Sequence, residues 1–322
     1  MGDGMSLLED RYRLTLRLLL PHAYRAEREE EMVAAFLEGS AGQSDEDNAR
    51  PRWSEIASVA TLGVRVRLGG PGAPPRYLLW GRVVRQVAVL GLFYHAMMGV
   101  EGVAEFFQYG PGPRSNAMVL AGGLLWFAAY AVLLVRGWAG PAKVLAGVAL
   151  ALLLALTWHD PITLAFFLPL HALPVLALVA GFHRDTPSPR PRWAPAALPI
   201  VPGLLIWALT GSSAVWFPRQ FNLPQWGLLW PWLDPVGLAC LGLLGAMAVH
   251  FVRGAGRSPF QPLALAILAV PLLIARIPVL LTQGSDAITQ TMTATQIGQC
   301  VALTLGAAAL TALGARAVPA SP

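Results

Sequence analysis

Five ionisable side chains lie within long apolar stretches of the chain, where an isolated charge is costly. They are the carboxylates of Glu101 and Glu105, the guanidinium of Arg276 and the imidazoles of His95 and His171. A charged group at the centre of a bilayer costs about 2.5–3.5 kcal/mol on insertion scales, so such groups usually serve a function. We therefore treat these five residues as a candidate polar site inside a membrane.

The spacing of the glutamates suggests how such a site could form. Glu101 and Glu105 are four residues apart, which places both carboxylates on one face of a helix. Glu101 lies about 26 Å into its apolar helix, and Arg276 lies equally far into a later helix that runs in the same direction. An ion pair between them would relieve both desolvation costs. In the alternative, all three side chains reach the outer interface separately and never meet.

The histidines add a second polar element at mid-membrane depth. His171 lies between two prolines of its apolar stretch, and Arg276 lies between two prolines of another. Each proline removes a backbone hydrogen bond and tends to kink its helix. A polar side chain beside the freed carbonyls can line a small wet cavity. His95 falls near the level of His171. In the alternative, both histidines simply bond to backbone or threonine within the bundle.

Other chemistry has little support in the sequence. Cys240 and Cys300 are the two cysteines, and they lack the CxxC spacing of a zinc site. Ser212 and Ser213 follow a glycine but lack the GxSxG context of a nucleophilic serine. We expect no catalytic residue, no metal and no cofactor, and an enzyme is the least favoured of the functional classes.

The composition is that of a membrane protein. Of the 322 residues, 55% are hydrophobic and 13% are charged, and the mean hydropathy is +0.55. Soluble domains carry about 25% charged residues. The net charge of +5 does not indicate nucleic-acid binding, because the first 85 residues hold 12 arginines and 12 acids and the excess lies in short loops. Almost all basic residues are arginines, since Lys143 is the only lysine. This preference for arginine is typical of a GC-rich bacterial genome.

Eight apolar stretches approach the length of about 20 residues that crosses 30 Å of hydrocarbon. We expect spans near 84–107, 115–136, 142–158, 162–182, 195–216, 235–252, 260–281 and 295–315. With a cytoplasmic amino terminus, the outer loops hold two basic residues, Arg114 and Arg219. The inner side holds eight: Arg136, Lys143, Arg184, Arg190, Arg192, Arg253, Arg257 and Arg316. This asymmetry predicts that both termini are cytoplasmic.

Two of the outer segments have a distinctive composition. Residues 217–234 are aromatic and interrupted by proline, which suits a segment lying in the outer interface. Residues 282–299 are rich in threonine and glutamine. They either coordinate a polar ligand or form a hydrated loop, and we favour the loop.

A module of three short amphipathic helices precedes the spans, near 7–20, 23–38 and 52–68. A glycine- and proline-rich linker follows it, so we divide the chain into a cytosolic module at 1–76 and a transmembrane bundle at 77–322. The predicted buried stripes are Leu8, Tyr12, Leu16, Leu19 and Leu20, then Met32, Val33, Phe36 and Leu37, then Trp53, Ile56, Ala60 and Val64. The charged run from Arg25 to Glu31 is either a solvated helix face or a docking surface for a partner.

The module also carries a resemblance. The string YRLTLRLLLPHAYRAEREEEM, followed by RPRWSEIASVATLGVRVRLGG, resembles the start of multi-pass membrane proteins of actinobacteria whose function is unknown. A looser proline–arginine–glutamate–methionine pattern is similar to the short helical module ahead of some bacterial permease-like proteins. The resemblance covers roughly the first 70 residues and implies no functional residue.

The sequence therefore predicts an all-α polytopic transmembrane helical bundle of about eight spans with a three-helix cytosolic module. We expect a multi-pass protein of the bacterial cell membrane that contacts lipid and binds no nucleic acid. The favoured function is non-catalytic regulation, sensing or assembly, in which residues 1–70 bind a cytosolic protein. The alternative is a transporter or permease component that uses the candidate polar site.

Overall fold

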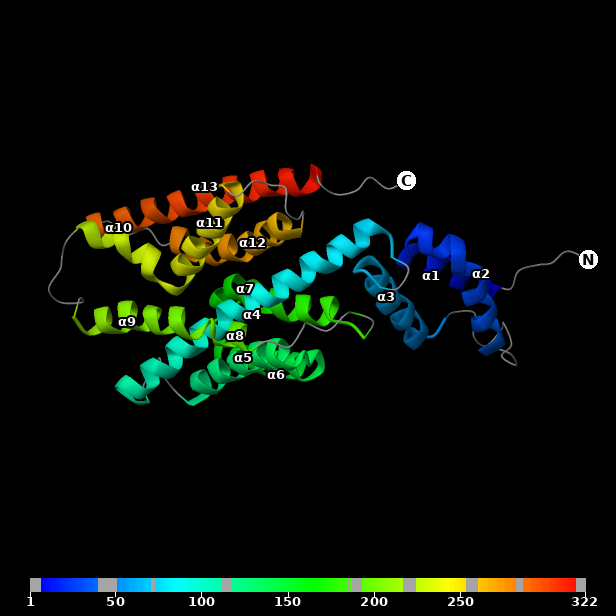
Figure 1. The fold of residues 1–322 in the computed structure, drawn as a ribbon, viewed down its shortest axis with the longest axis horizontal. Coiled ribbons are helices and arrows are strands. Elements are labelled where there is room, and N and C mark those ends of the chain that lie inside the picture. Colours follow the sequence, from blue (N-terminus) through cyan, green and yellow to red (C-terminus); the bar gives the residue numbers. More distant parts are fainter. Residues whose placement is uncertain are drawn as a thin grey trace, which may run out of the picture. The chain divides into compact units, whose positions relative to one another are not determined.

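The protein is helical throughout the part of the chain that its computed structural model describes, with no strand in that part. The described residues are 7–39, 51–70, 73–111, 117–184, 186, 193–216, 224–252, 260–281 and 286–316. The predicted all-α polytopic bundle is confirmed. Its helices (Figure 1) are α1 Leu7–Leu19, α2 His22–Gly39, α3 Trp53–Arg67, α4 Pro75–Tyr109, α5 Ala117–Arg136, α6 Ala139–Thr157, α7 Pro161–Gly181, α8 Ala194–Ala197, α9 Ile200–Trp216, α10 Pro224–Leu233, α11 Pro235–Val252, α12 Phe260–Leu281 and α13 Ala287–Arg316.

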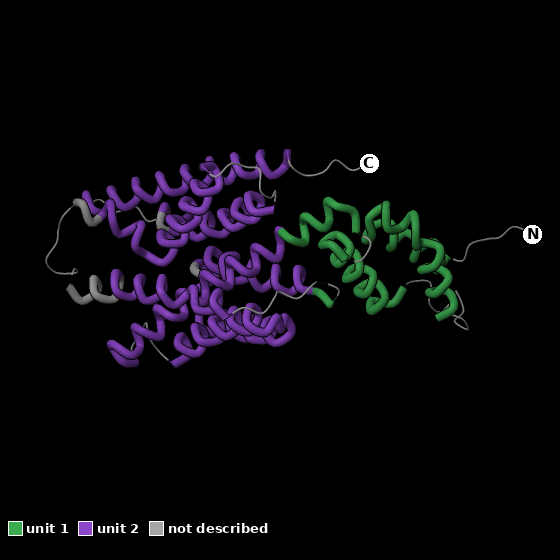
Figure 2. Tube along the Cα trace, viewed as in Figure 1, with its two compact units in different colours: residues 1–82, 183–186, 319–322 green, residues 83–182, 187–318 purple. Residues whose placement is uncertain are grey.

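The chain divides into two compact units, coloured separately in Figure 2. Unit 1 comprises residues 1–82, 183–186 and 319–322, and unit 2 comprises residues 83–182 and 187–318. Helix α4 begins in unit 1 and continues through unit 2. The domain division at 76/77 stays a prediction.

Unit 1 packs α1, α2 and α3 around a small core of its own. Leu8, Tyr12 and Leu16 recur every four residues along α1 and are buried, as the periodicity predicts. On α2 the buried residues are Val33 and Phe36. The rings of Tyr12 and Phe36 stack with centroids 3.9 Å apart. The core thus joins the first two helices along their predicted apolar stripes.

The predicted stripe of α3 is wrong. Trp53 is 84% exposed and Val64 is also exposed, whereas the buried residues are Val59, Gly63 and Val66. The middle of α3 is apolar or small on most sides, so its periodicity does not select a face. Gly63 selects it, because a side chain there would collide with the Leu19 carbonyl at the end of α1. The glycine face can approach α1 most closely and is therefore the one that is buried.

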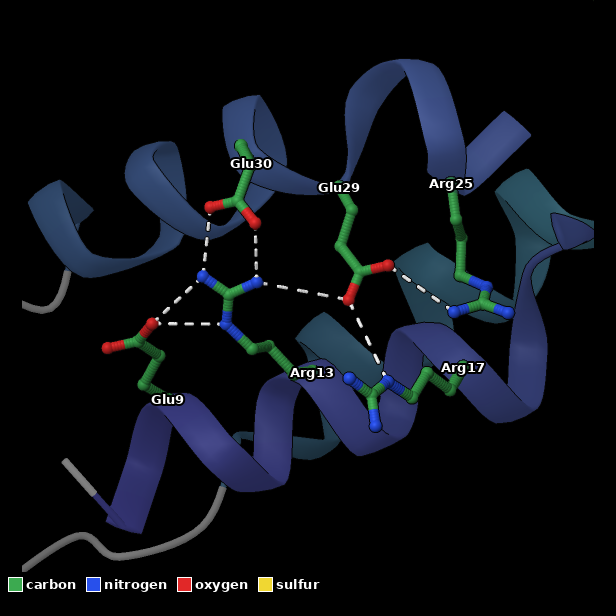
Figure 3. A network of polar contacts seen from close by, with 6 residues as sticks. All are labelled: Glu9, Arg13, Arg17, Arg25, Glu29 and Glu30. Atoms are coloured by element: carbon green, nitrogen blue, oxygen red, sulfur yellow. Dashed lines mark hydrogen bonds and ion pairs between the residues drawn. The ribbon is translucent and has the colours of Figure 1, made fainter. Parts of the chain in front are cut away.

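Charged side chains link α1 to α2 (Figure 3). Arg13 donates to both carboxylate oxygens of Glu30, at 2.7 and 2.9 Å, and to Glu9 at 3.1 Å. Glu29 lies 3.3 Å from Arg25 and 3.9 Å from Arg13. The hydrogen bonds from Arg13 lower the pKa of Glu30. This carboxylate therefore stabilises the fold above its unfolded pKa, and that stabilisation is lost as the pH falls through the lower folded value.

Unit 2 contains the helices suited to a bilayer. Seven described helices are long and apolar enough to cross it, namely α4, α5, α6, α7, α11, α12 and α13. The predicted fifth span, 195–216, corresponds to α9, whose 17 residues leave it shorter than these seven. Its role as an eighth span stays a prediction. Six of the loop arginines counted for the topology lie outside the described residues: Arg114 and Arg219 of the outer loops, and Arg190, Arg192, Arg253 and Arg257 of the inner loops.

Helix α13 begins earlier than the sequence suggests. The hydrated loop predicted at 282–299 is wrong from Ala287 onward, where the chain is helical, and 282–285 lie outside the described residues. Asp286 accepts hydrogen bonds from the backbone N–H and the hydroxyl of Thr289, at 2.9 and 2.7 Å. Thr293 donates to the carbonyl four residues before it. These polar side chains form hydrogen bonds within their own helix. A segment rich in threonine is therefore not necessarily a loop.

The predicted interfacial segment 217–234 also contains a helix. Residues 224–233 form α10, and 217–223 lie outside the described residues. A Cβ added at Gly227 would lie 2.7 Å from the Ile288 carbonyl oxygen, so α10 packs closely against α13. The segment is therefore part of the bundle over its helical length.

The core of unit 1 can be tested with two leucines of α1. Leu16 is fully buried and Leu18 is 72% exposed. We expect Leu16→Ala to destabilise unit 1 by about 2–5 kcal/mol, because the change leaves a cavity. Leu18→Ala should cost no more than about 0.5 kcal/mol. Hydrogen exchange of the α1 and α2 amides, measured on the detergent-solubilised full chain, reports both values. Equal effects of the two changes would contradict this packing.

Candidate functional site

Helix α4 carries His95 between two glycines that allow neighbouring helices to approach. Gly91, His95 and Gly99 are spaced four residues apart and share one helix face. A Cβ at Gly91 would lie 2.7 Å from the Cβ of Pro174 on α7. On α5, a Cβ at Gly123 would lie 2.9 Å from the Cα of Gly99. Small residues at such contacts bring membrane helices close together. His95 is therefore held between α5 and α7.

The two candidate histidines are in contact. The rings of His95 and His171 stack with centroids 4.6 Å apart, and His95 also stacks on Trp126 of α5 at 4.4 Å. His95 Nε2 lies 3.2 Å from the Leu170 carbonyl oxygen, to which it donates in its Nε2–H tautomer. His171 Nδ1 lies 3.0 Å from the Phe167 carbonyl oxygen. Both histidines therefore bond to backbone and also meet each other.

Proline explains why Leu170 offers a free carbonyl. In a helix this carbonyl would accept the N–H of residue 174, but Pro174 has none. An unpaired carbonyl in hydrocarbon costs several kcal/mol. His95 supplies the missing donor from α4, which fixes the histidine ring at this level of the bundle.

Arg276 forms the second polar cluster of unit 2, with a partner that the sequence did not suggest. Its side chain is almost completely buried, and Nη1 donates to Asp234 Oδ2 at 2.7 Å. Asp234 is the single residue between α10 and α11. Nη2 donates to the Pro231 carbonyl oxygen at 2.8 Å. Arg276 therefore links the end of one helix to the start of the next.

The break between α10 and α11 creates the groups that Arg276 satisfies. Pro235 follows Asp234 and has no N–H for the carbonyl four residues before it, which belongs to Pro231. That carbonyl accepts from Arg276 and also from Gln299 Nε2 of α13, at 2.7 Å. Asp234 in turn caps α11, since its Oδ1 accepts the N–H of Gly237 at 2.7 Å. We call Pro231, Asp234, Arg276 and Gln299 the arginine centre.

The arginine centre keeps some unmet hydrogen-bonding capacity. Arg276 Nε, Gln299 Oε1 and Gln296 Oε1 are buried and have no hydrogen-bond partner among the residues that the structure describes. Gln296 precedes Gln299 by one turn of α13. A donor and two acceptors thus remain available around the break, although the charge of Arg276 is already neutralised by Asp234.

The expected pairing of Arg276 with the glutamates is corrected. Glu101 and Glu105 are half-buried on α4, but neither forms an ion pair or hydrogen bond with Arg276 among the described residues. The sequence argument placed the groups at equal depth. Depth leaves the rotation of each helix undetermined, and the rotation of α12 turns Arg276 toward Asp234.

Sequence reasoning missed Asp234, Gln299 and Trp126. Asp234 was assigned to an interfacial segment, although Asp followed by Pro is a strong signal for the N-cap and first position of a helix. Gln299 lies where the favoured loop 282–299 overlaps the predicted span 295–315, and Trp126 lies within the predicted span 115–136 without having been singled out. Among the described residues, no three His, Cys, Asp or Glu side chains are grouped as a metal would require.

Comparison with known proteins finds no matching family model, no matching curated protein and no matching solved structure. Function must therefore be argued from the geometry of this chain.

A double-mutant cycle tests the arginine centre. Arg276→Ala should destabilise the bundle by about 3 kcal/mol, because it leaves the partly buried Asp234 carboxylate uncompensated. Asp234→Asn should destabilise the Arg276→Ala variant clearly less than it destabilises the wild-type chain. As a control, Glu101→Gln should add to Arg276→Ala within about 0.5 kcal/mol. Unfolding of the full chain in mixed micelles measures each variant. Additive effects at Asp234, or coupling to Glu101, would refute the pairing.

Proposed function

We propose that this chain is a non-catalytic multi-pass protein of a bacterial cell membrane, with a regulatory, sensing or assembly role. Its bundle anchors the protein, and α1 to α3 dock a cytosolic protein. We further propose that α9 is the eighth span, since 17 residues extend about 26 Å, close to the thickness of the hydrocarbon core. Both termini are then cytoplasmic, in agreement with the arginine-rich inner loops.

The observation that carries this proposal is a second apolar face on α1. Leu7, Leu14 and Leu18 are exposed, although three other apolar residues of the same helix are buried in the core of unit 1. Their spacing of seven and four residues aligns them along one side of the helix. We call Leu7, Leu14 and Leu18 the α1 stripe. Exposed apolar residues at helical spacing are typical of a helix that packs into a groove of a partner.

The charge of the module favours a protein over the membrane surface as its partner. Helices that lie on anionic membranes are rich in basic residues on their polar face. Here, Glu9 and Asp10 stand in the first turn of α1, and the first 85 residues are neutral overall. The ionic contacts of Arg13 are also made within the module, which leaves little net attraction to lipid head groups.

Photo-crosslinking in cells tests the docking proposal with the full chain. A photoreactive amino acid at Leu14 should form an adduct with one protein, and Leu18→Glu in the same chain should abolish it. The control is the same amino acid at Ala35, an exposed residue of α2 that should form no such adduct. Adducts with lipid alone, no protein adduct, or the same adduct from Ala35 would each overturn the proposal.

A transporter or permease component is the second candidate, and the helix break favours it. Transporters commonly place binding sites where a membrane helix is interrupted and charged groups meet the freed helix ends. The break at Asp234, together with the unpaired buried atoms of Gln296 and Gln299, has these features. Against it, the charge of Arg276 is already neutralised by Asp234, and its two terminal nitrogens bond to Asp234 and to the Pro231 carbonyl.

A further inference from the structure

A cavity of about 540 Å³ lies inside unit 2 between α4, α7, α9, α11 and α12. This volume falls within the range of about 300–1,000 Å³ found for ligand pockets. Among the residues whose side chains the structure describes, every lining residue is apolar apart from Tyr94. The Tyr94 hydroxyl lies 3.5 Å from the Pro235 carbonyl oxygen, so the polar atom of the lining already has a neighbour. The cavity thus requires no polar group from an occupant.

The cavity is open on the side where α9 and α11 face outward. Leu205 and Leu209 of α9 and Leu241 of α11 line the cavity, and all three are exposed. Leu205 and Leu241 both lie well inside their apolar helices, away from either end. The opening therefore lies at the depth of the hydrocarbon core. Deeper in the cavity, Leu170 of α7 and Leu265 of α12 are buried lining residues.

We propose that this cavity binds a hydrocarbon chain of a membrane lipid, which enters sideways between α9 and α11. A polar solute would lose its hydrogen bonds to water against such a lining, which disfavours a soluble substrate. An empty cavity would leave the lining without dispersion contacts. Lipid chains are the apolar molecules present at its opening. A chain that reaches Leu170 and Leu265 is surrounded by protein and differs from lipid that only covers the outer surface.

Two glycines of α11 provide a matched pair of variants. Gly242 lines the cavity, and a Cβ added there would meet no atom within 4 Å. Gly245 has equally open surroundings but is not a lining residue. Gly242→Phe therefore adds a ring at the cavity wall with no clash at its Cβ, and Gly245→Phe adds the same ring outside the lining.

The test uses the full chain in nanodiscs of phosphatidylcholine that carries a photoreactive diazirine midway along one acyl chain. Labelled positions are mapped by mass spectrometry of peptides. We expect adducts at the inner residues Leu170 and Leu265 as well as at Val249, an exposed residue of α11 that normalises the signal. Gly242→Phe should lower the inner labelling about tenfold, because losing contacts worth two methylene groups already has that effect on affinity. Gly245→Phe should leave it unchanged.

Each result decides the proposal. Inner residues that remain unlabelled in the wild-type chain would overturn it, whether or not the variants fold. Inner labelling that persists in Gly242→Phe, or falls equally in Gly245→Phe, would also overturn it. If Gly242→Phe fails to fold, Ala246→Phe on the same cavity wall replaces it with the same expectation.

Discussion

A backbone carbonyl without a donor is expensive in hydrocarbon, and unit 2 is organised around this cost. At two places, a side chain from elsewhere in the chain meets a carbonyl that a proline releases. His95 lies against the Leu170 carbonyl released by Pro174, and Arg276 against the Pro231 carbonyl released by Pro235. Tyr130 donates at 2.9 Å to the Pro195 carbonyl, which also accepts the N–H of Leu198 at 3.3 Å. His95 and Arg276 therefore lie where proline interrupts the backbone hydrogen bonds of a helix.

This relation shows how far the sequence can predict the fold and the site. Apolar length gave the spans, and the level of His95 and His171 could be estimated from their positions along their helices. Each proline also indicates which carbonyl is free, since the acceptor lies four residues earlier. The donor that will reach it depends on the rotation of a separate helix. For this reason the depth of Arg276 could be predicted and its partner Asp234 could not.

The failures in α3 and α13 have a different origin. In α3, most faces are apolar or small, and the close approach allowed by Gly63 decides which side is buried. In α13, threonine and glutamine were taken as signs of a loop. Asp286 instead begins the helix, and each of several threonines bonds to the carbonyl one turn before it. A segment rich in polar residues is expected to face water when its side chains need water for their hydrogen bonds. Where those side chains already bond to their own helix, as in α13, a polar composition does not indicate a loop.

Most of the candidate polar residues have a structural use in the bundle. His95 and Arg276 hold freed carbonyls and helix ends in place, and His171 bonds to the Phe167 carbonyl of its own helix, so all three act first as structural contacts. The surfaces that the fold leaves without such a use are the α1 stripe in unit 1 and the apolar cavity in unit 2. The docking and lipid-binding proposals therefore rest on these two features, and they are independent of each other.

The central claim is that the arginine centre lies within hydrocarbon, where its hydrogen bonds are needed. Val301 is an exposed residue of α13, two positions after Gln299. A nitroxide spin label can be attached there through Val301→Cys in a chain whose two native cysteines have been replaced by alanine. In nanodiscs, its relaxation should respond strongly to oxygen and weakly to a water-soluble nickel complex. A stronger response to the nickel complex would place this level of α13 in water and contradict the account.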